Sequence, residues 1–224
     1  MSLKPDARLE GFYVEFEDGE LRLVLRRRRT LTEGNYPLAG FSFVIDAGHG
    51  GDDPGALGPM GAVLPESHIV LANVQLLAGR LQKLGADVTI IRDTTGSFYT
   101  LQERVDISRS IKPDMFISIH ANSTAETTDA TNIHGFTMWH RNVNSFPLAE
   151  FFMNSLHYIN PLTTRHRTVH QANFFVCRPV WVPSVIVEIS FMNNIHDFAW
   201  MINPNNQVKL AWGMVNAILG YYHE

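Results

Sequence analysis

The chain has 224 residues, of which 45% are hydrophobic and 18% are charged, so it can bury a large core and is not intrinsically disordered as a whole. Its formal net charge is −4, which excludes nucleic-acid binding by bulk electrostatics. A single cysteine excludes a disulfide framework and a Cys-based zinc finger, so any metal site must be built from the ten histidines and from carboxylates.

Neither a membrane span nor a signal peptide is visible in the sequence. No stretch approaches the roughly 18 apolar residues that a membrane span needs. The first residues, Met1 to Pro5, are not followed by the apolar segment of a signal peptide. We therefore expect that any natural export signal is absent from this chain.

Residues 1–39 are strand-like and charged. Apolar and polar side chains alternate over residues 12–16 and again over residues 21–25, which is the period of a half-buried strand. Asp18-Gly19 lies between the two runs and is a hairpin signal. Arg26–Arg29 form a run of four arginines, which we interpret as a solvated edge strand rather than as a contact for an anionic polymer, because charge protects exposed strand edges.

From residue 40 onward, expected strands and helices alternate. The predicted strands are Phe41–Asp46, Asp87–Ile91, Met115–Ile119, Phe136–Trp139, Phe174–Cys177 and Val185–Phe191. The predicted helices are Glu66–Leu84, Leu101–Ser110, Ser145–Tyr158 and Pro204–Tyr221. This alternation predicts an α/β fold with a twisted, mostly parallel sheet and helices on both faces. The chain then divides into a hairpin-like segment, residues 1–39, and one domain, residues 40–224.

Reactive side chains follow three of these strands. His49 lies in the glycine-rich loop after the first strand, His120 follows the third, and Glu188 lies near the end of the sixth. Ligands bind at the carboxyl ends of the strands in such sheets, so these side chains should lie along one edge. A phosphate-binding role for the glycine loop is disfavoured, because it lacks the P-loop lysine and because Asp52 and Asp53 would repel phosphate.

Each candidate also has a structural explanation. Burying Glu188 is costly unless its carboxylate is paired, and an ion pair with Arg178 would serve that purpose. His49 would be a turn histidine, and His120 would be a hydrogen-bonded core residue. Glu66, which begins the next predicted helix, would be favoured there by the helix dipole.

Taken together, the four residues fit one site. Two neutral imidazoles and one carboxylate make an open zinc site with water as the fourth ligand. A further glutamate then supplies the acid and base that hydrolysis needs. The donor types favour zinc without excluding other divalent ions. No HExxH segment is present, so the site is not carried by a single helix.

Several motifs occur in the order of a known family. They are Val44–Ala56 (VIDAGHGGDDPGA), Glu66 at the head of a helix, Arg92-Asp93, Leu101–Arg104 (LQER), Phe116–Asn122 (FISIHAN) and Val187–Asn194 (VEISFMNN). On these motifs the chain resembles, over about residues 40–224, the zinc-dependent N-acetylmuramoyl-L-alanine amidases of bacterial cell walls, in the group called amidase type 3.

The resemblance implies a zinc-dependent amide hydrolase. It implies His49, Glu66 and His120 as zinc ligands and Glu188 as the catalytic acid/base. The implied reaction is cleavage, by zinc-activated water, of the amide between the lactyl group of N-acetylmuramic acid and L-alanine of the stem peptide. The substrate would be peptidoglycan, met by a secreted, periplasmic or cell-wall enzyme. Two alternatives stay open: a zinc peptidase acting on cell-wall peptides, and a catalytically silent peptidoglycan-binding module.

The sequence departs from the family pattern at a few positions. Ala47 stands where proline is usual, Ser190 where glycine is usual and His170 where lysine is common. His170 is therefore a candidate for substrate contact. Only residues 123–134 separate the second histidine motif from Gly135, so we expect a short surface loop and no built-in inhibitory helix. A monomer is the default expectation for the oligomeric state.

Overall fold

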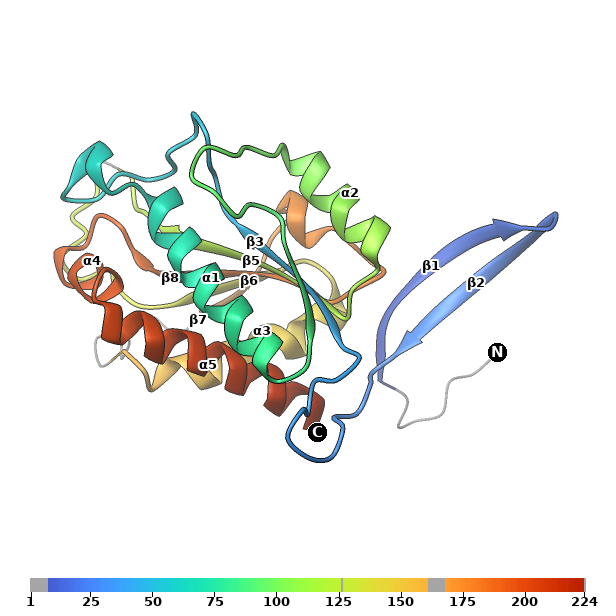
Figure 1. Ribbon diagram of the computed structural model, residues 1–224. Helices are drawn as coiled ribbons and strands as arrows, with labels where there is room; N and C mark the ends of the chain where they lie inside the picture. The colour runs from blue at the N-terminus through green and yellow to red at the C-terminus, as the bar shows by residue number, and fades with distance from the viewer. Residues whose placement is uncertain (1–7, 126, 161–167, 224) are drawn as a thin grey trace.

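The computed structural model describes residues 8–125, 127–160 and 168–223, which form a sheet flanked by helices and a separate hairpin (Figure 1). The six-stranded sheet has the order β4-β3-β5-β8-β6-β7. Its strands are β3 (Ser42–Ala47), β4 (Asp87–Ile90), β5 (Met115–Asn122), β6 (Thr137–His140), β7 (Thr168–Gln171) and β8 (Ser184–Phe191). Strands β4, β3, β5 and β8 are parallel, whereas β6 is antiparallel to β8 and parallel to β7. The prediction of a mostly parallel sheet is confirmed.

The two faces of the sheet are covered differently. One face packs against α1 (Glu66–Lys83), α3 (Phe146–His157) and α5 (Pro204–His223) in the main hydrophobic core. The other face carries a smaller core with α2 (Leu101–Ile111) and the 3-10 helix η4 (Phe175–Cys177). Successive strand residues point to opposite faces, so Ile119 and Val187 enter the main core. His120 and Glu188 therefore point to the other face.

The prediction of a strand over Phe174–Cys177 is wrong. Phe174 is the N-cap and Phe175–Cys177 form η4, in which Val176 and Cys177 are buried against the α2 face of the sheet. A short apolar run signals burial, but it does not say whether the buried segment pairs with a sheet. The edge strand beside β6 is β7, at Thr168–Gln171, a segment that the prediction left outside any strand.

Smaller elements complete the fold. Helix α4 (Ile195–Met201) was not predicted, although Asn194 caps it by accepting hydrogen bonds from the backbone of His196 and Asp197. Two further 3-10 helices are η1 (Gly61–Val63) and η2 (Val143–Ser145). Among the described residues, no helix is both long and apolar enough to cross a membrane.

Residues near the N-terminus form an antiparallel hairpin of β1 (Leu9–Glu17) and β2 (Glu20–Arg27) that projects from the body (Figure 1). Asp18 and Gly19 join the strands, with φ angles of 52° and 78°. Positive φ at both positions matches the two-residue turns that follow the natural twist of a hairpin.

The interpretation of the arginine run as a solvated edge is wrong for Arg26 and Arg28, which are partly buried, whereas Arg27 and Arg29 are exposed. Arg26 donates hydrogen bonds to the carbonyl oxygens of Pro113 and Trp181, at 2.5 and 3.1 Å. Arg28 and Arg29 also bind groups of the body or of the hairpin's foot, chiefly Glu10, Asp114, and the Tyr221 and Gly40 carbonyl oxygens. The guanidinium groups of the run therefore attach the hairpin to the body. Their carbonyl and carboxylate partners are distant in the sequence, so the local sequence could not predict these contacts.

Candidate metal centre and active site

The loop after β3 carries His49 and is held by two arginines. Arg92 donates hydrogen bonds to the carbonyl oxygens of Ala47 and Gly48, at 3.1 and 2.9 Å. Arg104 donates to the carbonyl oxygen of His49 at 2.8 Å and forms a buried ion pair with Asp46. His49 itself has a φ of 61°, in the left-handed region. The guanidinium groups thus stabilise an unusual backbone path that presents the His49 imidazole at the sheet edge.

Glu66 begins α1 and is almost completely buried. Its Oε2 accepts a hydrogen bond from the backbone N–H of Ala56 at 2.8 Å, and its Oε1 accepts one from Ala121 at 3.0 Å. These two bonds come from the glycine-rich loop and from β5. The carboxylate therefore links three segments that are distant in the sequence.

Two imidazoles converge on this carboxylate. Nε2 of His49 lies 3.2 Å from Glu66 Oε1, and Nδ1 of His120 lies 3.1 Å from the same oxygen. The two rings are nearly perpendicular, at 81°, with centroids 4.9 Å apart. One ligand atom from each of the three residues lies within 4.8 Å of the others. This is the donor set and spacing of a metal site with three protein ligands.

The pKa values show how strongly the cluster favours positive charge. Burial alone would raise the pKa of Glu66, but hydrogen bonds with His120 and His49 outweigh it and hold that pKa far below its ordinary value. Burial likewise opposes protonation of His49, yet the hydrogen bond and charge of Glu66 raise the His49 pKa to about 9. The carboxylate is stabilised by the positive charge of the protonated imidazoles, and a divalent cation bound to the same three side chains would supply such a charge instead. The residues therefore fit a metal ion.

Asp53 contacts the His49 ring, and the sequence reasoning did not include it in the site. Its Oδ2 lies 2.8 Å from Nδ1 of His49, and its Oδ1 accepts a hydrogen bond from the backbone of Gly55. A carboxylate on Nδ1 favours the tautomer that leaves Nε2 free to bind a metal. Asp53 lies four residues after His49 in the sequence. The backbone path of a glycine-rich loop cannot be predicted from sequence, so the contact between the two side chains could not be predicted either.

Glu188 lies beside the cluster, on β8, and pairs in register with His120 on β5. Its burial, together with the negative charge of Glu66, raises its pKa to about 7 against the attraction of His120. Its Oε2 has no hydrogen-bond partner among the described residues. The suggested ion pair with Arg178 is wrong, since Arg178 donates to Asn173 and lies over the ring of Phe175. A half-buried carboxyl group with one buried oxygen that has no partner is suited to proton transfer.

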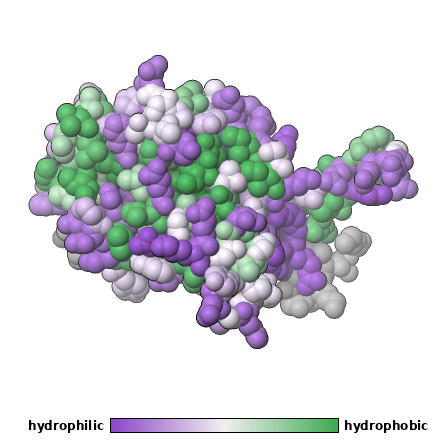
Figure 2. All heavy atoms as spheres, in the orientation of Figure 1, coloured by the Kyte–Doolittle hydropathy of each residue, from purple (hydrophilic) through white to green (hydrophobic). Residues whose placement is uncertain are grey.

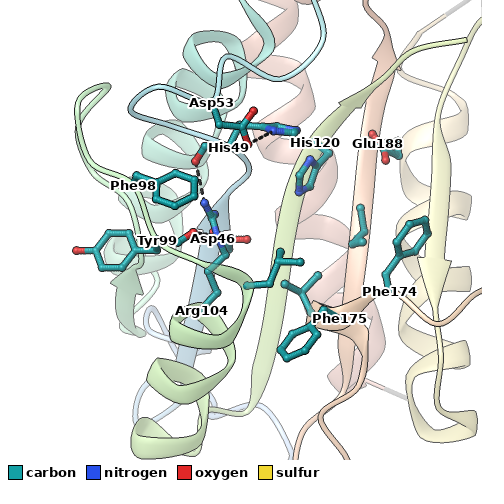
Figure 3. A pocket seen from close by; sticks show the side chains of 13 residues that line it. Asp46, His49, Asp53, Phe98, Tyr99, Arg104, His120, Phe174, Phe175 and Glu188 are labelled. Atoms are coloured by element: carbon teal, nitrogen blue, oxygen red, sulfur yellow. Dashed lines mark hydrogen bonds and ion pairs between the residues drawn. The ribbon is translucent and has the colours of Figure 1, made fainter. Parts of the chain in front are cut away.

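A pocket of about 380 Å³ opens over these groups (Figure 3). Its floor includes His49, His120 and Glu188. Its walls are aromatic: Phe98 and Tyr99 precede α2 on one side, and Phe174 and Phe175 lie at η4 on the other. The structure therefore brings His49, Glu66, His120 and Glu188 together at one accessible edge of the sheet.

Two other expectations concern the surroundings of the pocket. His170 stacks on Trp139, with ring centroids 4.5 Å apart, and Trp139 meets Phe174 edge-on. His170 is not among the residues that line the pocket itself, so its contact with substrate stays a prediction. The described part of the 123–134 segment contains no helix, in keeping with the expected short loop.

A family model described as N-acetylmuramoyl-L-alanine amidase matches residues 43–220. The Bacillus subtilis protein YqiI is 34% identical over 188 residues, which cover 84% of this chain and 88% of YqiI. N-acetylmuramoyl-L-alanine amidase LytC of the same species is 31% identical over 186 residues; the match covers 83% of this chain but only 36% of LytC.

Solved structures of N-acetylmuramoyl-L-alanine amidases are also similar to this chain. N-acetylmuramoyl-L-alanine amidase AmiC2 of Nostoc punctiforme superposes with a TM-score of 0.75 and 29% identity, covering 84% of this chain and 99% of that structure. The catalytic domain of the amidase CwlV from Bacillus (Paenibacillus) polymyxa var. colistinus gives a TM-score of 0.73 and 27% identity, covering 81% and 97%.

Proposed function

Because the chain belongs to the N-acetylmuramoyl-L-alanine amidase family and is a peptidoglycan amide hydrolase, we propose that His49, Glu66 and His120 bind zinc and that Glu188 is the catalytic acid/base. The observation that carries this assignment is the convergence of both imidazoles on one buried carboxylate, beside a carboxyl group whose Oε2 has no hydrogen-bond partner among the described residues. The bond to be cleaved joins the lactyl group of N-acetylmuramic acid to L-alanine.

The donor set supports zinc. Two imidazole nitrogens and one carboxylate oxygen, with no thiolate, are a common ligand set of hydrolytic zinc sites. When bound, zinc supplies a Lewis acid for the scissile carbonyl and lowers the pKa of water. Asp53 holds the His49 ring, and the Ala56 and Ala121 N–H groups hold the Glu66 carboxylate, so the ligands are oriented before the metal arrives.

Glu188 performs the proton transfers in this proposal. Its carboxylate first accepts a proton from the attacking water, and the protonated side chain then donates that proton to the departing alanine nitrogen. Its raised pKa suits both roles, because a group that titrates near neutral pH can accept and release a proton. The aromatic walls of the pocket exclude water from the substrate on both sides of the reacting bond.

We further propose that residues 40–224 are the catalytic domain and that residues 1–39 are an accessory hairpin. The match to the family over residues 43–220 supports this boundary. The substrate class places the site of action at the cell wall or in the periplasm. The described residues of the hairpin do not line the pocket, so we expect neither the activity nor the metal site to require it.

The decisive experiment is turnover on purified peptidoglycan sacculi with and without a chelator. Zinc-dependent release of free stem peptides, with alanine at their new N-terminus, supports the proposal, and mass analysis of the fragments identifies the bond that is cleaved. Fragments cut within the peptide would instead indicate a zinc peptidase. Binding without any turnover would indicate a silent peptidoglycan-binding module.

A further inference from the structure

The three candidate metal ligands and Glu188 lie side by side across the sheet, and this arrangement gives a bound amide a direction. His120 is on β5, and Glu188 is on the neighbouring strand β8. His49 follows β3, which borders β5 on its other side. In Figure 3, His49 and Glu188 accordingly lie on opposite sides of His120. A substrate that spans the site therefore has one end on the His49 side and the other end on the Glu188 side.

The proposed reaction assigns a different part of the substrate to each side. The nitrogen of the scissile amide must lie within hydrogen-bond reach of Glu188, which protonates it as it departs. The carbonyl group must face the three ligand side chains. Because the nitrogen belongs to L-alanine and the carbonyl to the lactyl group, the stem peptide should extend past Glu188 towards β6. The glycan should extend in the opposite direction, towards the loop that carries His49.

An aromatic row continues the pocket on the Glu188 side. On β6, Trp139 pairs in register with Ile186 of β8 and with His170 of β7, so the three side chains share one face of the sheet. Ile186 lines the pocket, which places Trp139 and His170 beyond it on the same face. Phe174 connects the two regions, because it lines the pocket and meets Trp139 edge-on, with ring centroids 5.1 Å apart. Trp139 and His170 are only half-buried, so each keeps part of its ring accessible.

The row lies within reach of a stem peptide. Neighbouring strands are about 4.8 Å apart, so β7 lies roughly 10 Å from β8. An extended peptide advances about 3.5 Å per residue. If its first nitrogen lies at Glu188, the second and third residues of the stem peptide therefore come over β6 and β7, where Trp139 and His170 lie.

The two sides of the site also differ in charge. On the side of the glycine-rich loop, the Asp53 carboxylate lines the pocket. On the other side, Arg178 is exposed, and its guanidinium group lies 4.7 Å from the centroid of the Phe175 ring, which forms part of the pocket wall. Glu150 is the only acidic residue between positions 137 and 187, and it belongs to α3, which packs on the other face of the sheet. A peptide with free carboxylates is therefore favoured on the Glu188 side.

Exposed apolar side chains alone would not locate this region. Figure 2 shows hydrophobic atoms in several places on the face in view and along the projecting hairpin, as is normal for a protein surface. The location follows instead from the side on which Glu188 lies and from the sign of the charge there. These two observations are independent of each other, and they agree.

We propose that the stem peptide crosses β8 and β6 towards β7, and that His170 and Arg178 bind its carboxylates beyond L-alanine. The glycan then lies on the side of Phe98. This inference rests on the proposed function and adds to it the orientation of the substrate. Stacking on Trp139, with ring centroids 4.5 Å apart and an interplanar angle of 27°, holds the His170 imidazole, whose N–H can donate to a carboxylate. Arg178 supplies a permanent positive charge.

The first test is a series of stem lengths, cleaved by the full, zinc-loaded chain. The probes are N-acetylmuramoyl-L-alanine and its extensions by D-glutamate and by a third residue, alanine. In the wild type, kcat/KM should rise at least about 10-fold from the shortest probe to the longest. His170→Ala should lose most of this gain without changing the shortest probe, and His170→Lys should recover it. His223→Ala, at an exposed histidine on α5, is the matched control and should keep the full gain.

Amidation of the probe tests the role of charge. The longest probe with all its free carboxylates converted to amides should lose most of the gain in the wild type. Arg178→Gln should cleave the charged and the amidated probes almost equally. Arg178 is exposed, so this variant still decides the question if His170→Ala fails to fold.

A glycan series tests the opposite side of the site. Its probes carry the same tripeptide on lactate alone, on N-acetylmuramic acid or on the disaccharide of N-acetylglucosamine and N-acetylmuramic acid. Phe98 is 53% exposed and lines the pocket on the His49 side. Phe98→Ala should reduce the gain from added sugar and keep the gain from added stem residues. His170→Ala should do the reverse.

Three outcomes would overturn the inference. They are a full stem gain in both the His170 and the Arg178 variants, equal cleavage of charged and amidated probes by the wild type, and an exchange of the two effects between His170→Ala and Phe98→Ala. The proposed function would remain in each case, since the lactyl–alanine bond is still cleaved.

A binding measurement decides the inference without turnover. The free tripeptide, L-alanine-D-glutamate-alanine, is titrated into the zinc-loaded chain in a calorimeter. The wild type should bind it at least about 10-fold more tightly than His170→Ala does. Equal affinities, or no binding by the wild type, would contradict the proposed path of the stem peptide.

Discussion

Glu188 and His120 are register partners on adjacent parallel strands, so the acid/base candidate and a metal-ligand candidate share one face of the sheet. Backbone hydrogen bonds between β8 and β5 fix the separation of the two residues. The relative position of the carboxyl group and the metal site is therefore set by the most rigid part of the fold rather than by a loop.

Glu188→Gln should abolish most activity while retaining zinc. The amide has nearly the shape of the carboxyl group but cannot exchange the proton, so we expect a loss of at least about 1,000-fold in kcat. Zinc content measured by atomic absorption should stay at the wild-type value. Appreciable turnover by the zinc-loaded variant would remove Glu188 from the proton-transfer role.

The same variant should be more stable than wild type when the metal is removed. Burial raises the pKa of Glu188 from 4.5 to about 7, so folding favours the protonated form and the carboxylate destabilises the folded state above that pH. Glutamine carries no such charge, and we expect a gain of about 1–3 kcal/mol in the free energy of unfolding at pH 8. The gain should vanish below pH 4.5. Urea unfolding in chelator at both pH values measures it.

Activity should rise with pH along an acid limb set by Glu188. A general base must be deprotonated, so kcat/KM increases as pH passes upward through its pKa. Burial raises that pKa towards about 7 in the metal-free chain, and a bound cation would lower it again. The limb should therefore fall between 4.5 and about 7. Glu188→Asp should shift the midpoint, whereas an unshifted limb would assign it to another group.

Asp53→Asn should weaken zinc binding without unfolding the protein. The substitution removes the negative charge beside Nδ1 of His49 and loosens the preferred tautomer. Losses of about 10- to 100-fold in metal affinity are typical of such partners. Competition with a chromogenic chelator measures the affinity. Asp52→Asn, which changes the exposed neighbouring carboxylate, is the control and should bind zinc as wild type does.

Gly48→Ala should damage the metal site, whereas Gly79→Ala should not. A Cβ atom at Gly48 would lie 2.2 Å from Cε1 of His120, so the ring must move out of the cluster. A Cβ atom at Gly79, inside α1, meets nothing within 4 Å. There, alanine should raise the free energy of unfolding by up to about 1 kcal/mol. Zinc stoichiometry and thermal unfolding of both variants give the comparison, and equal zinc content would contradict it.

Local sequence was enough to predict the α/β class and the four candidate site residues. The alternation of strand-like and helical periods is a short-range property. The motifs around His49 and His120 are continuous segments of the sequence, so they can be identified without the structure. Because the ends of parallel strands meet at one edge, the sequence also predicted that His49, His120 and Glu188 lie along the same edge of the sheet, but the pairing of β5 with β8 that places His120 beside Glu188 came from the tertiary structure.

Contacts between distant segments decided the rest. Val176 and Cys177 could be buried in either a strand or a 3-10 helix, and the tertiary structure shows that they lie in η4, in the smaller core that includes α2. Likewise, the sequence shows only that Arg26 is a charged residue at the end of a strand, and the tertiary structure shows that it donates hydrogen bonds to the carbonyl oxygens of Pro113 and Trp181. The apolar rows of the hairpin predicted a half-buried strand, yet tertiary structure leaves them facing outward, because no other described element lies over that face. Hydrophobic periodicity reports that a face should be covered, and only the three-dimensional arrangement shows whether the chain itself covers it.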